Sequence, residues 1–240
     1  MAEWRSHEGG AIRPEPEPPK KQKILYNQSM TDKTKVMLFA WATTSLAVIL
    51  AVVAWGQGLK WTFDGNAGLV YQVFPLFGLL AFSIMWSHYT ASVFRQIKGV
   101  DKKALNTYFQ ITSLLVLVAI LLHPSLLWFQ LWRDGYGLPP NSYLTHYVAP
   151  TLRWAAALGT LGLSIFLAYE LRRFFDKKNW WKYIVYATDV AIIAIFVHGL
   201  KLGKNLQQPG WFQKVWYFYG ITLLASLLYI YNAKRQDNKK

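Results

Sequence analysis

Apolar residues in this chain come in long blocks, separated by short charged stretches. Each block is about 20 residues long, which as a helix matches the hydrocarbon core of a bilayer. Only 16% of the residues are charged, against about 25% in an ordinary soluble domain. Spans of this length are helices, because a helix satisfies every backbone group within its own segment. The sequence therefore predicts an all-α integral membrane protein.

The blocks predict six transmembrane helices packed as a bundle. Their expected bounds are Val36–Trp55, Ala67–Tyr89, Leu105–Trp128, Val148–Tyr169, Tyr183–Leu200 and Val215–Tyr231. The third helix could continue to Trp132 despite Pro124. Tryptophans gather at the expected ends, as in the aromatic belts of membrane proteins. These tryptophans are Trp55, Trp61, Trp128, Trp132, Trp180, Trp181 and Trp211.

The basic residues predict which side of the membrane each loop faces. The tails and the loops after the second and fourth spans hold 20 of the 26 lysines and arginines, and the other loops hold 6. The positive-inside rule then places both termini in the cytoplasm of a multi-pass plasma-membrane protein. Basic loops beside anionic lipid account for the net charge of +14 without nucleic acid. We expect a disordered basic tail over residues 1–35, the bundle over 36–232, and a second basic tail over 233–240.

The sequence excludes several kinds of chemistry. It has no cysteine, which excludes thiolate catalysis, cysteine-ligated iron–sulfur clusters and disulfides. It also lacks the GxGxxG, Walker, HExxH and GxSxG motifs. Any function must therefore come from polar residues within or beside the apolar blocks.

Two histidines stand in closely similar apolar settings. His123 lies in VAILLHPSLLW and His198 in AIIAIFVHGLKLG. Each falls 16 or 17 residues after the cytoplasmic start of its span, about 25 Å along the helix axis. Both helices run in the same direction, so the imidazoles should reach the same depth, near the outer leaflet. At matched depth they could bind a haem iron from both faces. The alternative is that each histidine caps its own helix end and binds nothing.

These segments resemble a known family. VAILLHPSLLW resembles the third span of the ferric reductase-like transmembrane domain, and WWKYIVYATDVAIIAIFVHGLKLGKN resembles its fifth. The resemblance extends over roughly residues 36–232 and touches the haem subunit of the methionine sulfoxide reductase system and the NADPH oxidase membrane core. It implies haems stacked between the third and fifth spans, with His123 and His198 as the outer pair of ligands.

The chain departs from that family in two ways. The inner ligand positions, 13 or 14 residues earlier, hold Phe109, Gln110, Ile184 and Val185, none of which binds haem iron. We therefore expect one bis-histidine haem b. No flavin or nicotinamide domain follows the last span, so electrons should come from a membrane quinol or a separate reductase.

Two further residues could serve electron entry. His88, at the cytoplasmic end of the second span, could bind a quinone or support an unusual inner haem, or it could be an interfacial histidine in water. Asp189 is the one acid well inside a span, and burying it costs a few kcal/mol unless it is paired or protonated. It could accept a proton or contact a quinone. Alternatively, it could be protonated and bonded to Thr188, Gln110 or a backbone carbonyl.

Three basic residues near the outer ends of the spans could contact haem propionates: Arg153, Lys201 and Lys204. The alternative is that their side chains extend to the lipid headgroups. A basic outer rim would also attract an anionic acceptor such as a ferric chelate. The loop WRDGYGLPPNSYLTHYVAP could fold over the haem edge.

Together these patterns predict a six-helix membrane cytochrome b. It would be an oxidoreductase-type subunit that transfers single electrons in or across the bilayer toward a ferric or other oxidised periplasmic acceptor. The second hypothesis is a haem-free membrane scaffold or accessory subunit that kept the bundle without redox activity.

Overall fold

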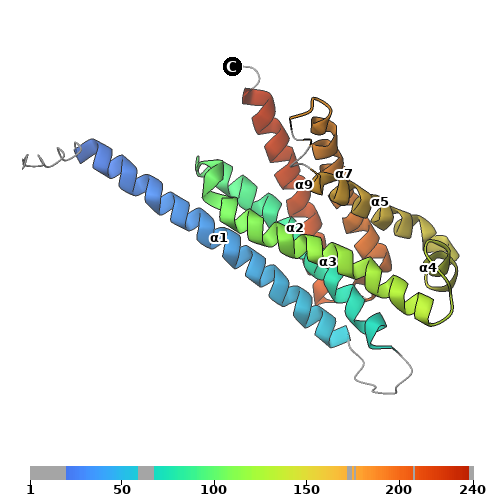
Figure 1. Ribbon diagram of the computed structural model, residues 1–240. Helices are drawn as coiled ribbons and strands as arrows, with labels where there is room; N and C mark the ends of the chain where they lie inside the picture. The colour runs from blue at the N-terminus through green and yellow to red at the C-terminus, as the bar shows by residue number, and fades with distance from the viewer. Residues whose placement is uncertain (1–19, 59–67, 172–174, 176, 208, 238–240) are drawn as a thin grey trace, which may run out of the picture.

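The computed structural model describes residues 20–58, 68–171, 175, 177–207 and 209–237, and it describes side chains only from residue 30 onward. Within these ranges the chain is helical and contains no strand. The α-helices are α1 Lys20–Gly58, α2 Leu69–Ile97, α3 Asn106–Arg133, α4 Asn141–His146, α5 Arg153–Glu170, α7 Trp181–Leu202, α8 Lys204–Gln207 and α9 Trp211–Asp237 (Figure 1). Short 3₁₀ turns precede α3 and α5.

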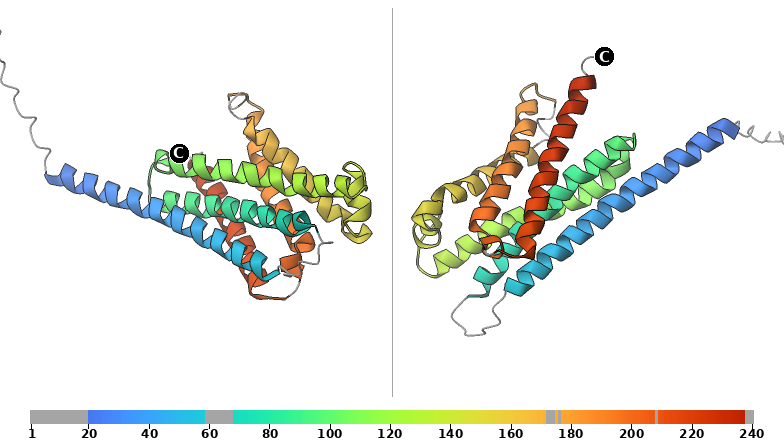
Figure 2. Two further views of the ribbon diagram at one scale, coloured as in Figure 1. Left: turned by 60° about the horizontal axis from the view of Figure 1, so that its bottom comes forward. Right: turned by 180° about the vertical axis from the view of Figure 1, so that it is seen from behind.

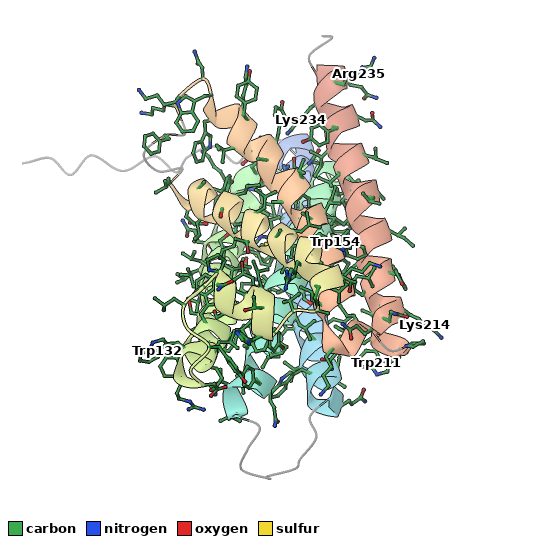
Figure 3. All side chains as sticks on the ribbon, turned by 90° about the vertical axis from the view of Figure 1, so that its right-hand side faces the viewer. Trp132, Trp154, Trp211, Lys214, Lys234 and Arg235 are labelled. Carbon is green, nitrogen blue, oxygen red and sulfur yellow. The ribbon has the colours of Figure 1, made fainter. Side chains whose placement is uncertain are left out.

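Helix α2 is the centre of the bundle. It packs against α1, α3, α7 and α9, whereas α5 packs mainly against α7. The start of α1, the α2–α3 turn, the start of α7 and the end of α9 lie at one end of the molecule (Figures 1 and 2). We call this the basic end, because its described side chains include Arg95, Lys98, Lys102, Lys103, Lys177, Lys178, Lys182, Lys234 and Arg235. Figure 3 shows Lys234 and Arg235 at the opposite end of α9 from Trp211 and Lys214.

Five helical segments in the described part of the chain are long and apolar enough to cross a membrane. They are Met30–Gly58, Leu69–Ile97, Lys102–Arg133, Pro150–Glu170 and Trp181–Leu202. The chain is thus an all-α protein with several membrane-spanning helices, as the apolar blocks predict. The sixth expected span lies within α9, a 27-residue helix that is not among these five. Its two tryptophans and four tyrosines lower its mean hydropathy.

The helices extend beyond the predicted spans. The sequence predicted a disordered tail through residue 35. This prediction is wrong from residue 20 onward, because α1 begins at Lys20. Residues 1–19 lie outside the described ranges. The final basic tail is likewise helical as far as Asp237. Neither extension contains glycine or proline, and lysine and glutamine favour helix, so nothing ends the helix at the edge of the apolar block. Helix α3 also continues through Pro124 to Arg133.

An aromatic cluster fixes α9 against α2 and α7. The Trp216 ring lies 4.3 Å from that of Phe82, and Tyr219 stacks on Trp86 with ring centroids 4.2 Å apart. The indole N–H of Trp216 donates to the Phe196 carbonyl on α7. A methyl group at Gly199 would lie 2.7 Å from the Trp216 ring, so only glycine lets this ring approach α7 so closely. This packing positions the C-terminal half of α7, where His198 lies.

Candidate functional site

The structure brings His123 of α3 and His198 of α7 together. Their ring centroids lie 6.3 Å apart, and the ring planes are nearly perpendicular at 89°. Neither α3 nor α7 is the main packing partner of the other, since α3 packs on α2 and α7 on α5. The two imidazoles therefore meet across the space between two helix pairs.

His123 is held by the facing surface of α2. Its Nδ1–H donates to the Phe74 carbonyl at 2.9 Å. Gly78 lies one helical turn beyond Phe74, and a Cβ there would lie 2.9 Å from the imidazole Cε1. The absence of a side chain at Gly78 thus opens the helix surface to the ring. Pro75 also lies inside α2 at this level, so the helix departs here from regular hydrogen bonding.

His198 is held in the same manner by α5. Its Nδ1–H donates to the Ala155 carbonyl at 2.8 Å. Gly159 lies four residues after Ala155, and a Cβ there would lie 2.5 Å from both Cε1 and Nδ1 of the ring. In both cases a histidine lies over a glycine and donates to the carbonyl four residues before that glycine. Because each Nδ1 carries the donated proton, each neutral ring keeps its lone pair on Nε2, the atom available to a metal.

A cavity of about 230 Å³ surrounds the two rings. Its walls come from α2, α3, α5 and α7, and Trp216 of α9 borders it. Tyr143, Tyr147 and Val148 of the α3–α5 connection also line the cavity, so this loop forms part of its wall. Most of the lining is apolar or aromatic, as is usual for a buried ligand site.

The spacing of the rings allows both imidazoles to reach one metal ion. A metal lies about 2.0–2.1 Å from an imidazole nitrogen, so two rings that bind one ion have centroids within about 6.5 Å of each other. The 6.3 Å between the centroids of His123 and His198 lies within that limit. The described residues contain no group of three or more His, Cys, Asp or Glu that could bind a metal. A metal at this site would need further ligands, and a porphyrin supplies four nitrogens. A porphyrin is larger than the 230 Å³ cavity, so binding one would require the aromatic side chains that border the cavity to move outward.

The three basic residues expected near haem propionates are not equivalent. Lys204 of α8 lines the cavity. Arg153 is exposed on the outer surface and donates from Nε to the Leu144 carbonyl at 2.9 Å. Lys201 is also exposed, and neither it nor Arg153 lines the cavity. The structure therefore brings only Lys204 to the site.

His88 lies in the half of α2 nearer the basic end, and it does not line the cavity. Its Nε2 bonds to the Thr112 hydroxyl at 2.7 Å, and its ring packs edge-on against Phe109. Thr112 donates its own proton to the Tyr108 carbonyl, so His88 must be the donor in their contact. Of the alternatives for His88, an interfacial histidine in water is wrong: the residue is partly buried and bonded to protein.

Asp189 joins three helices. It accepts hydrogen bonds from the hydroxyls of Tyr89 on α2, at 2.8 Å, and Tyr231 on α9, at 2.6 Å. The partners expected from the sequence are wrong, because Thr188 instead donates to the Val185 carbonyl of its own helix. Both carboxylate oxygens thus have a donor. Nothing in the sequence links positions 89, 189 and 231, so residue counting could not identify this cluster.

Comparison with known proteins gives one family match. Residues 148–200 match a family described as a predicted membrane protein, DUF2127. These residues form α5 and most of α7, including Gly159 and His198. No curated protein matches the chain, and no solved structure does. The match supports an integral membrane protein with apolar helices.

Proposed function

We propose that this protein is a membrane cytochrome that binds one haem b between His123 and His198. The observation that supports this most directly is the pair of imidazoles 6.3 Å apart in an apolar cavity, each with its Nδ1–H bonded to a carbonyl. A bound haem b would supply one-electron redox chemistry. The chain's resemblance to the ferric reductase-like domain supports the same assignment.

The residues around the imidazoles have distinct roles in this proposal. The Phe74 and Ala155 carbonyls fix the orientation and tautomer of the rings and raise the basicity of Nε2. The apolar lining keeps water from the site and thereby tunes its potential. Lys204, on the cavity wall, would neutralise an anionic substituent of the ligand.

We further propose that α9 is the sixth span and that the basic end faces the cytoplasm. The positive-inside rule supports this orientation, since the described lysines and arginines concentrate at that end. The histidine site then lies in the outer half of a plasma-membrane bundle. Its electrons would pass to an oxidised acceptor on the outer side, such as a ferric chelate.

The residues around His88 support one haem and not two. Phe109 packs against His88, and Gln110 is exposed on α3. Ile184 and Val185 offer no ligand on α7. The electron donor would be a membrane quinol or a separate reductase, with His88 and the Tyr89–Asp189–Tyr231 cluster as the polar groups available to it.

The test is the haem content of the purified chain. Protein expressed with a haem precursor should be red and should contain one haem per chain by pyridine haemochrome assay. His123→Ala and His198→Ala should each lose the haem. His88→Ala and His146→Ala are the matched controls and should keep it, since His146 is exposed and stacked on Tyr136 away from the cavity. A colourless wild-type protein would refute the proposal and favour the haem-free scaffold.

A further inference from the structure

A second hollow lies on the outer surface of α5, away from the histidine cavity. It is a shallow groove lined by Tyr143 and Leu144 of α4 and, from α5, by Arg153, Trp154, Ala157, Thr160, Leu161 and Ser164. Trp154 and Leu161 are 49% and 54% exposed, so the groove faces outward from the bundle. For a helix that crosses a membrane, outward means toward lipid.

The end of the groove at the N-terminus of α5 carries a fixed positive charge, that of Arg153. The Arg153 guanidinium is held at Nε by the Leu144 carbonyl, which leaves its terminal N–H groups for another partner. No carboxylate of the described residues lies within 4.0 Å of this guanidinium. The ion pairs in the described part of the chain join Lys35 to Asp32 and Arg133 to Asp134. Trp154 stands beside it, as tryptophan does at the level of lipid headgroups. This end of the groove is therefore suited to an anionic headgroup.

The rest of the groove suits a hydrocarbon chain. Trp154, Ala157, Leu161 and Ser164 follow one another at spacings of three and four residues, so they form one stripe along α5. Ala157 and Ser164 are small, which makes the stripe hollow. From Arg153 to Ser164 the helix rises about 16 Å, and one leaflet of the hydrocarbon core is about 15 Å thick. The groove thus has a charged end and an apolar body that together match one leaflet.

We propose that this groove binds one phospholipid with an anionic headgroup. The phosphate is held by Arg153, and one acyl chain lies along Ala157, Leu161 and Ser164. Tyr143 and Thr160 line both the groove and the histidine cavity, and their hydroxyls lie 3.2 Å apart. The acyl chain therefore covers the outer side of the wall that closes the cavity. The proposal does not depend on haem binding.

The experiment is native mass spectrometry of the full chain in detergent, titrated with phosphatidylglycerol. The wild type should bind one lipid. Arg153→Gln should weaken that binding by roughly ten-fold or more, the loss expected for one charge-assisted phosphate contact. Ala157→Leu, which fills the trough and keeps the charge, should weaken it comparably. Arg133→Gln is the matched control, an exposed arginine at the same end of the bundle but outside the groove, and should bind as the wild type does.

Four outcomes would overturn the proposal. If Arg133→Gln loses as much affinity as Arg153→Gln, the attraction is general surface charge. If inorganic phosphate competes with the lipid at equal concentration, or if Ala157→Leu binds normally, the acyl chain does not occupy the groove. If Arg153→Gln binds normally, the headgroup is not held there. Because the readout is the mass of bound lipid, it is independent of whether the chain contains haem.

Discussion

Replacing Gly159 by alanine should weaken binding of the proposed haem without unfolding the protein. The added Cβ would lie 2.5 Å from Cε1 and Nδ1 of His198, whereas ordinary contacts begin at 3.4 Å. The ring must therefore move by about 1 Å to restore a normal separation. Such a shift stretches the 2.8 Å bond from Nδ1 to the Ala155 carbonyl beyond hydrogen-bonding range.

The effects on stability and on binding should differ. The lost hydrogen bond costs about 1 kcal/mol, and alanine in place of a helical glycine returns about 1 kcal/mol. The midpoint of thermal unfolding of the haem-free protein should therefore stay close to that of the wild type. Haem affinity should fall about 10- to 100-fold, as when a ligand loses the partner that orients it. Haem per chain, measured by pyridine haemochrome assay, and thermal unfolding in detergent report the two quantities separately.

Two other glycines make this a graded test. At Gly78 the added Cβ would lie 2.9 Å from His123, so the ring there needs a smaller shift and Gly78→Ala should lose less haem. Gly56, in α1, has no atom within 4 Å of an added Cβ, and Gly56→Ala should behave as the wild type. If Gly159→Ala retains full haem, or if Gly56→Ala loses as much, the imidazoles are not docked for ligation as we describe.

The remaining predictions concern polar contacts away from the histidine pair. Tyr89→Phe should lower the free energy of unfolding more than Tyr231→Phe, because both remove a hydrogen bond to Asp189 but Tyr231 is 37% exposed. Chemical unfolding in detergent would measure both changes, and equal losses would contradict the prediction. Directly after α3, hydrogen bonds from Tyr71 and from Gln130 hold the pKa of Asp134 below its ordinary 3.8. The stability from this carboxylate is full above that value and is lost as the pH falls through the lowered pKa. Asp134→Asn should thus flatten the acid limb of stability against pH, and an unchanged limb would refute the assignment.

The apolar helices and the proximity of His123 to His198 could be predicted because both depend on distance along a helix axis. Apolar block lengths predicted several membrane-spanning helices, and a fixed rise per residue predicted that the two histidines lie close together, as their rings do. The tails were predicted less well, since apolarity marks where lipid ends and not where helix ends. Helix α1 accordingly begins 16 residues before the predicted span, at Lys20.

The rest of the site depends on how each helix is rotated about its axis, which residue counts do not determine. Gly78 and Gly159 lie inside helices, where glycine costs about 1 kcal/mol relative to alanine, and this is the only signal in the sequence that they have a packing role. Which imidazole each glycine faces follows from the pairing of α2 with α3 and of α5 with α7. The partners of Asp189 come from two other helices for the same reason.

The docking of each histidine on a separate helix pair has a consequence for assembly. His123 is secured within the α2–α3 pair and His198 within the α5–α7 pair, and 74 residues of chain lie between the two histidines. Each half of the site can therefore form within its own hairpin as that hairpin inserts into the membrane. A ligand that bonds to both rings can bind only after the hairpins have met, and it then cross-links them. Cofactor insertion would be the last step of biogenesis, and it would lock together two independently made halves.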